Sequence, residues 1–197
     1  QAYIGMCNML DAYIGRLLNT LRSMGALENT IVVFTSDHGD YLGQHGFWSK
    51  GLPAYDDAQK VPLIVWWPPG MNGVQKGRTQ ALFSLVDLPA TFLDIAELDQ
   101  VAGMQGISQM PVICGETRAV RDWVLVENLP TSYMQQMTFV KDGHKLVINE
   151  APESTELYDL HADPRQMRNL ANNPEFYTLK EDLQSACDVA IKEKDRR

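Results

Sequence analysis

Apolar and polar positions in the first half of the chain switch between a helical and a strand pattern. Apolar residues in 1–24 recur at spacings of three and four, which predicts an amphipathic helix with one core-facing stripe. The continuous apolar runs 31–34 and 63–67 predict two strands buried on both faces. A helix, a tight turn at Gly25 and a buried strand form half of a βαβ unit, so we expect a largely parallel sheet here.

The middle of the chain predicts shorter elements. Residues 79–85 favour a short strand, and Asp87 is a good N-cap for a helix that runs to about residue 96. Glycine and proline interrupt every periodicity in residues 97–117, which predicts a connection that crosses the surface.

The last eighty residues change character. Four short strand patterns follow one another at 122–127, 135–141, 144–149 and 155–160. Asp142-Gly143 between two of them is a strong hairpin signal. Asn173 with Pro174 then predicts the start of a final helix that runs to about residue 192.

Together these patterns predict an α/β fold: part of a mixed, largely parallel sheet flanked by helices, followed by a small antiparallel sheet with one helix. We place the boundary between an α/β region at 1–117 and an α+β subdomain at 118–197. A chain of 197 residues can hold one substantial core, or a large domain piece and a small one.

Charge, hydropathy and cysteine content narrow the classes of function. The net charge of −8 argues against a nucleic-acid surface, which needs clustered Lys and Arg. No apolar run approaches the roughly 20 residues of a membrane span, so no membrane partner is expected. The three cysteines are far apart and predict neither a CxxC site nor a disulfide framework.

The most informative stretch is a polar, glycine-punctuated loop of about 25 residues between the two front strands, longer than compact connections usually are. Asp37 and His38 stand directly after the first strand, where ligands of open parallel sheets bind. A carboxylate and a neutral imidazole can both ligate a divalent cation. The alternative is an Asp that caps a helix beside a surface His, and local sequence leaves both open.

Three further features of the loop could carry chemistry. Lys50 could hold an anionic substrate group as a point charge, or it could simply be solvated. His45 is a candidate substrate-binding residue, with packing inside the loop as its alternative. Asp56-Asp57 could supply paired carboxylates, but they more readily begin a short helix after Pro53.

These residues resemble the sulfatase family of the alkaline phosphatase superfamily. The loop carries the resemblance in Ser36-Asp37-His38-Gly39-Asp40, Leu42-Gly43, His45-Gly46, Trp48, Lys50, Tyr55-Asp56-Asp57 and Lys60-Val61-Pro62. Further matches in the family's order are Leu10-Asp11, Leu27-Glu28-Asn29-Thr30, Val86-Asp87-Leu88-Pro89, Gln105-Gly106-Ile107-Ser108, Glu156-Leu157-Tyr158-Asp159-Leu160, Asp163-Pro164 and Asn169-Leu170-Ala171. The collinear set covers nearly the whole chain.

The resemblance implies roles for the loop residues. Asp37 and His38 would be two ligands of a divalent metal, Ca²⁺ first, with Mg²⁺ or Mn²⁺ as alternatives. Many family members have Asn where His38 stands. Lys50 would contact a sulfate oxygen and act in catalysis, and His45 would be a second substrate contact.

One family feature has no counterpart in this sequence. The family's nucleophile is a formylglycine made from Cys or Ser in a Cys/Ser-x-Pro-x-Arg motif, and neither Cys7, Cys114 nor Cys187 begins one. The resemblance therefore implies that this chain is the C-terminal portion of a sulfatase. It would require the N-terminal part of the same protein, which would carry the formylglycine, and would be inactive alone.

The resemblance also leaves functional alternatives open. The first expectation is hydrolysis of sulfate esters of a small molecule or glycan. A phosphonate or phosphate ester hydrolase of the same superfamily is the close rival, and a non-catalytic binding or interaction module is the second. Oligomeric state is left open, and a periplasmic or secreted location is favoured over a cytoplasmic one.

Overall fold

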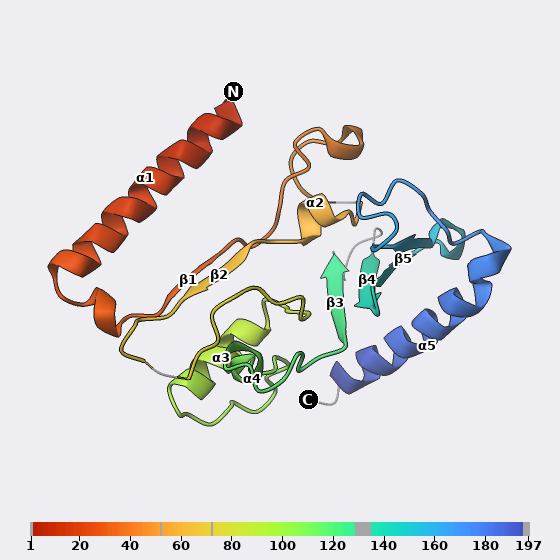
Figure 1. Ribbon diagram of the computed structural model, residues 1–197. Coiled ribbons are helices and arrows are strands. Elements are labelled where there is room, and N and C mark those ends of the chain that lie inside the picture. Colours follow the sequence, from red (N-terminus) through yellow and green to blue (C-terminus); the bar gives the residue numbers. More distant parts are fainter. Residues whose placement is uncertain (1, 52, 72, 129–134, 195–197) are drawn as a thin grey trace. The chain divides into compact units, whose positions relative to one another are not determined.

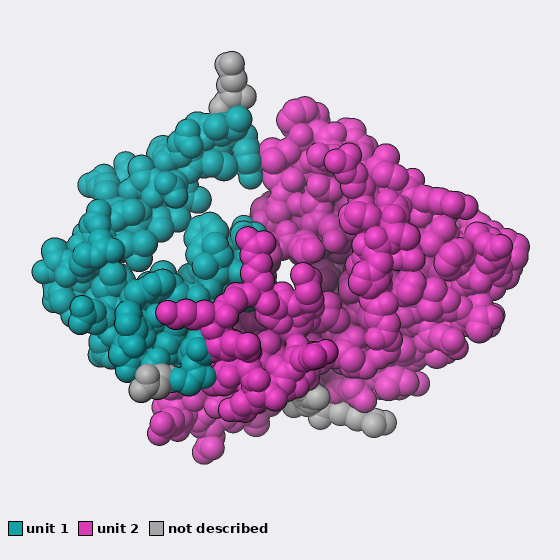
Figure 2. Space-filling model, viewed as in Figure 1, with its two compact units in different colours: residues 1–36, 62–74 teal, residues 37–61, 75–197 magenta. Residues whose placement is uncertain are grey.

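A computed structural model describes residues 2–51, 53–71, 73–128 and 135–194 (Figure 1). The chain forms two compact units, Gln1–Ser36 with Pro62–Val74, and Asp37–Val61 with Gln75–Arg197 (Figure 2). The predicted α/β class is confirmed, whereas the predicted boundary at 117/118 stays a prediction.

The first unit contains one long helix and a two-stranded ribbon. Helix α1 spans Ala2–Ser23 and is followed by the short helix η1, Leu27–Asn29. Gly25 ends α1 as predicted, because its φ of 66° is left-handed and the N–H groups of Gly25 and Ala26 reach the carbonyls of Arg22 and Leu21.

The ribbon departs from the predicted largely parallel sheet. Strands β1, Val32–Thr35, and β2, Leu63–Trp66, pair antiparallel, with Thr35 opposite Leu63 and Val32 opposite Trp66. The intervening segment leaves and re-enters at the same end of the pair, so the chain returns as a hairpin would. A parallel neighbour would need a crossover to the opposite end.

The apolar pattern of the first unit is only partly covered. The partly buried residues of α1 are Ile14, Gly15, Leu18 and Leu21, at the predicted helical spacing, but no residue of α1 is fully buried. The predicted two-sided burial of the strands is wrong for β2, where Ile64 is 61% exposed. A single helix and two short strands do not supply a second layer for both faces of a strand.

The second unit is built on an antiparallel meander of the four predicted strands. These are β3, Trp123–Asn128, β4, Gln136–Lys141, β5, His144–Asn149, and β6, Glu156–Asp159, in that spatial order. Asp142 and Gly143 form the predicted two-residue turn with φ of 49° and 73°, the conformation that favours this dipeptide in hairpins.

The two faces of this sheet pack against different elements. Phe139, Leu146 and Leu157 face the final helix α5, Tyr177–Lys194, and form the main core with buried residues that include Leu183 and Cys187. On the alternate positions Val147 and Tyr158 pack with Ala54 of the loop that precedes α2, Asp56–Gln59. The sheet is therefore covered by a helix on one face and by the returning loop on the other.

The ends of the final helix also agree with the sequence. The side chain of Asn173 accepts a hydrogen bond from the Glu175 N–H, and Pro174 opens the short helix η4, Pro174–Phe176, which leads into α5. No described helix is long and apolar enough to cross a membrane.

Two predictions for the middle of the chain are wrong. Residues 79–85 form no strand, and Val86, not Asp87, caps helix α3, Asp87–Ile95. Asp87 is instead fully buried, and its carboxylate pairs with the Arg121 guanidinium and accepts hydrogen bonds from Ser84 and Ile107 N–H groups. The segment before α3 thus bonds to a carboxylate rather than to a neighbouring strand. The predicted connection over 97–117 contains one helical turn, α4, Met110–Ile113.

Truncation of Leu146 tests the core between β5 and α5. Leu146 is fully buried, so Leu146→Ala should lower the free energy of unfolding by about 2–5 kcal/mol through lost burial and a residual cavity. Urea titration measures this. Val189→Ala on the exposed side of α5, where the side chain is 54% exposed, should change it by less than about 0.5 kcal/mol. Equal effects would contradict the packing described.

Candidate active site

The candidate site lies on residues 37–61, and Tyr41 holds this loop closed. Tyr41 is 1% exposed, and its N–H donates to the Ser49 carbonyl oxygen at 2.9 Å. Its hydroxyl contacts the carbonyl oxygens of Gly51, at 2.7 Å, and Pro53. One buried side chain therefore joins the two arms of the loop.

The loop backbone is strained at three residues that are not glycine. Leu42, His45 and Ser49 have φ values of 50°, 52° and 69°, in the left-handed region that L-residues seldom adopt. Conformations of this kind persist only when surrounding contacts impose them, and they concentrate at functional sites. The short helix η2, Gln44–Gly46, lies inside this strained part.

The structure brings three of the predicted site residues together. Lys50 Nζ lies 2.8 Å from His38 Nε2, and His38 Nε2 lies 3.4 Å from Asp37 Oδ2. The side chain of Asp37 is 82% exposed and that of His38 is 40% exposed. A carboxylate, an imidazole and an ammonium thus meet at an accessible surface.

Hydrogen bonding assigns the proton of the His38 ring. His38 Nδ1 lies 2.8 Å from the carbonyl oxygen of Gly39, which can only accept, so Nδ1 carries the hydrogen. When the ring is neutral, its lone pair is on Nε2, the atom that faces Asp37 and Lys50. Histidines that bind metals commonly donate their other ring N–H to a backbone carbonyl in this way.

The charge state of Asp37 also suits a cation. Desolvation, the largest single effect, raises the pKa of its carboxyl group, but charge interaction with His38, the N–H groups of Asp37 and His38, and the Lys50 ammonium together outweigh it. The net effect lowers the pKa, so the group stays ionised. Among the residues that the structure describes, no cluster of three or more His, Cys, Asp or Glu side chains is arranged to hold a metal ion.

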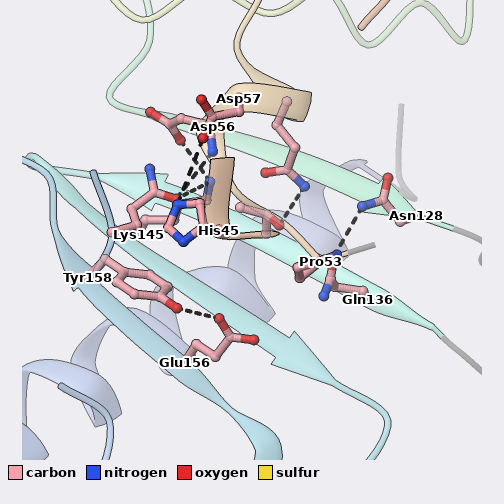
Figure 3. A network of polar contacts seen from close by, with 12 residues as sticks. His45, Pro53, Asp56, Asp57, Asn128, Gln136, Lys145, Glu156 and Tyr158 are labelled. Atoms are coloured by element: carbon pink, nitrogen blue, oxygen red, sulfur yellow. Dashed lines mark hydrogen bonds and ion pairs between the residues drawn. The ribbon is translucent and has the colours of Figure 1, made fainter. Parts of the chain in front are cut away.

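His45 lies in a different part of the loop. Its ring stacks on Tyr55 with centroids 3.6 Å apart and planes at 3°, and its side chain is 9% exposed. Its Nε2 atom lies 3.8 Å from Asp57 Oδ2, and these two residues are labelled in Figure 3. These contacts are those of a residue packed within the loop, and its role toward substrate stays a prediction.

Asp56 and Asp57 begin the short helix α2, as predicted. Lys145 in β5 contacts the carboxylate of Asp56, and sequence reasoning missed this partner. One signal was available: Lys145 shares a strand face with Val147, and a lysine in phase with a buried apolar position points to a covered partner.

Comparison with known proteins places the chain among sulfatases. The sulfatase family model matches residues 1–98. The chain is 31% identical over 200 residues to N-acetylglucosamine-6-O-sulfatase of Bacteroides thetaiotaomicron and 30% identical over 197 residues to the arylsulfatase of Clostridium perfringens. The chain belongs to the sulfatase family. These matches cover 97% and 100% of this sulfatase chain but only 35% and 40% of the two relatives.

Solved structures agree with that assignment. A protein in complex with its substrate D-glucosamine-2-N,6-O-disulfate superposes with a TM-score of 0.80 at 32% identity, covering 95% of this sulfatase chain and 39% of its own. A 2-O glycosaminoglycan sulfatase gives 0.84 at 28%, with 95% and 41% covered. The phosphonate monoester hydrolase of Agrobacterium radiobacter gives 0.84 at 23%, with 98% and 41% covered, which shows a shared fold.

The hydroxyl of Tyr41 predicts an alkaline component of stability. Burial, followed by Asp57 and Tyr55, raises the pKa of Tyr41 to about 12. The folded state therefore keeps a proton that the unfolded chain loses near a pH of about 10. This contribution to stability is complete below about pH 10 and is lost as the pH rises to about 12.

Tyr41→Phe tests this prediction. The carbonyl oxygens of Gly51 and Pro53 lose the single hydroxyl donor that they share, so the free energy of unfolding at neutral pH should fall by about 1–3 kcal/mol. In an ultraviolet pH titration, the variant should lose a tyrosine that titrates near pH 12. Tyr3→Phe, where the side chain is 46% exposed, should change neither quantity. Titration of Tyr41 at the ordinary value would refute its role as a buried donor.

Proposed function

We propose that this chain is the C-terminal portion of a sulfatase that hydrolyses sulfate monoesters. The observation that carries the proposal is the meeting of Asp37, His38 and Lys50 at one accessible point, with Nε2 of His38 facing the other two side chains. Membership of the sulfatase family supports the same reaction.

Lys50 supplies the positive charge for the substrate. A lysine ammonium is a compact point charge with three donors, which suits a non-bridging sulfate oxygen. Contact with that oxygen holds the anion and stabilises charge that develops as the ester bond breaks.

Asp37 and His38 would hold a divalent cation, with Ca²⁺ proposed first and Mg²⁺ or Mn²⁺ as alternatives. An ionised carboxylate beside an imidazole of fixed tautomer is a fitting donor pair. Once bound, the cation would polarise the sulfate group as a Lewis acid. Its remaining ligands would come from residues outside this sequence.

The nucleophile is also proposed to lie outside this sequence. No Cys/Ser-x-Pro-x-Arg segment occurs in the 197 residues, so a formylglycine would have to come from the preceding part of the same protein. Translating the gene upstream of Gln1 tests this directly. If the upstream reading frame encodes no such motif, the proposed sulfatase activity is rejected and the non-catalytic binding module is favoured.

The proposed substrate is a sulfated small molecule or glycan. One relative is named an N-acetylglucosamine-6-O-sulfatase, another a choline-sulfatase of Rhizobium meliloti, and a solved relative holds a disulfated glucosamine. A phosphonate ester hydrolase is the second candidate, because the phosphonate monoester hydrolase shares the fold. Sulfate and phosphonate groups are both tetrahedral anions and are bound by similar contacts.

Lys50→Ala in the full-length protein tests the anion-binding role. Turnover of an aryl sulfate should fall by about 10²–10³-fold, the usual effect of removing one group that stabilises transition-state charge. Lys76→Ala, an exposed lysine outside the loop, should leave turnover unchanged. Turnover of an aryl phosphonate far above that of the sulfate by the unaltered protein would favour the second candidate.

Metal removal tests the Asp37–His38 pair. Dialysis of the full-length protein against EDTA should abolish turnover, and Ca²⁺ should restore it. Asp37→Asn should weaken Ca²⁺ binding measured by calorimetry by at least about ten-fold, because a charged oxygen ligand is lost. Asp99→Asn, at an exposed position, is the matched control. Unchanged calcium affinity in Asp37→Asn would rule out Asp37 as a ligand.

A further inference from the structure

We propose that Lys145 in the C-terminal sheet is a positioning residue for the Asp37–His38–Lys50 cluster, and that it acts through α2 and Gly39. The inference rests on the proposed function, because it assigns Lys145 a part in keeping that cluster assembled. Lys145 lies far along the chain from the loop, and its described hydrogen bonds and ion pair do not reach the cluster itself.

The first link joins the sheet to α2. Lys145 is 1% exposed, and its Nζ atom lies 2.7 Å from Asp56 Oδ1 and 3.2 Å from Gln166 Oε1 (Figure 3). The same Gln166 oxygen accepts from the Asp56 N–H at 3.2 Å. Asp56 is therefore held at both its side chain and its backbone, at the first turn of α2.

The second link joins α2 to the cluster. The Gly39 N–H donates to the Ala58 carbonyl oxygen at 2.8 Å. A Cβ atom on Gly39 would lie 1.9 Å from the Asp57 carbonyl oxygen, so only glycine permits this approach. Gly39 also provides the carbonyl that fixes the ring of His38, and His38 in turn contacts Lys50. Displacement of α2 thus moves the acceptor that sets the His38 tautomer.

The energetics of the first link favour a positioning role over a purely stabilising one. Burial lowers the pKa of Lys145, and the charge of Asp56 only partly offsets this. Buried ion pairs seldom stabilise more than apolar residues of the same size, but removal of one partner is costly. A directional pair fixes one arrangement of α2 where apolar contacts would allow several.

Gln166, which bonds to both Lys145 and Asp56, has a strained backbone and, among the described residues, an unsatisfied side-chain donor. It has a left-handed φ of 55°, and its buried Nε2 atom has no hydrogen-bond partner in the part of the chain that the structure describes. Its oxygen nevertheless serves both Lys145 and Asp56. Strained and unsatisfied groups of this kind persist where the surrounding structure requires a particular geometry.

Other contacts hold α2 on the sheet without charge. Gln59 Nε2 donates to Thr138 Oγ1 at 3.0 Å, and Ala54 packs with Val147 and Tyr158. These contacts should keep the loop on the sheet when the ion pair is removed. Loss of Lys145 should therefore loosen the geometry of the loop rather than unfold the unit.

Lys145→Met in the full-length protein tests the inference, with Lys141→Met on the neighbouring strand as the matched control. Lys141 pairs with Asp122 at a partly exposed position on β4, outside the network that leads to α2. Methionine keeps an unbranched apolar side chain as far as the Cε position and removes the charged Nζ donor.

Hydrogen exchange followed by mass spectrometry gives the first readout. Exchange in residues 37–61 should be at least about ten-fold faster in Lys145→Met, since local opening tracks local contacts, while exchange in β3–β6 stays unchanged. Lys141→Met should match the unaltered protein. Unchanged exchange in 37–61 overturns the inference, as does an equal increase over the whole sheet.

Kinetics gives a readout that mere stability would not move. At a temperature well below the melting transition of both proteins, kcat on an aryl sulfate should fall about 10–100-fold in Lys145→Met, as for other residues that orient metal ligands. KM should change by less than about three-fold, because the anion-binding charge is still present. Unaltered kcat with lowered melting temperature would show that Lys145 is only structural.

A second variant decides the matter if Lys145→Met does not fold. Asp56→Asn keeps the shape of the partner and an oxygen acceptor for Lys145, and should produce the same local increase in exchange to a smaller extent. Unchanged exchange in 37–61 for this variant overturns the inference. The hydrogen-exchange measurements do not depend on turnover. Absence of sulfatase activity in the unaltered protein would therefore reject the proposed function, while the exchange test of Lys145 would still apply.

Discussion

The close approach of the Gly39 backbone to α2 is the constraint on which the candidate site depends. The side chain of Asp37 is largely exposed and that of His38 partly exposed, and such side chains hold a fixed geometry only when the backbone beneath them is fixed. The hydrogen bond from Gly39 to Ala58 does this for one arm of the loop, and Tyr41 does it for the other. The candidate cluster thus takes its geometry from the contacts beneath it.

The antiparallel sheet of the second unit therefore has two roles. Through Phe139 and Leu157 it forms a core with α5, and through Val147 and Tyr158 it supports the segment that carries α2. Successive side chains of a strand point to opposite faces of the sheet, so one strand contributes to both layers at once. The final helix on one face and the loop of the candidate site on the other therefore pack on the same four strands.

Local elements were predictable where the chain itself contains their determinants. The four strands of the meander, the Asp142-Gly143 turn and the Asn173 cap follow from alternation, turn chemistry and capping within a few residues. Features set by distant partners were not predictable. Asp87 looks like an N-cap by itself, but a guanidinium 34 positions away and two backbone N–H groups determine its place. The direction of β2 was missed for the same reason, since pairing depends on where the connection returns.

The candidate site was likewise predictable only in part. The motif order of the loop identified Asp37, His38 and Lys50, and the structure brings these three together, although their roles await experiment. The closure by Tyr41 and the pairing of Asp56 with Lys145 depend on how the chain folds back, which the spacing within the loop does not reveal. Lys145 is the clearest case: a strand lysine would ordinarily face solvent, but the pleat directs this one into a covered layer. There a carboxylate and an amide oxygen accept from its ammonium group, which makes its burial acceptable. The geometry of a family motif can therefore be maintained by residues that lie outside the motif, and a search confined to the motif would leave them unassigned.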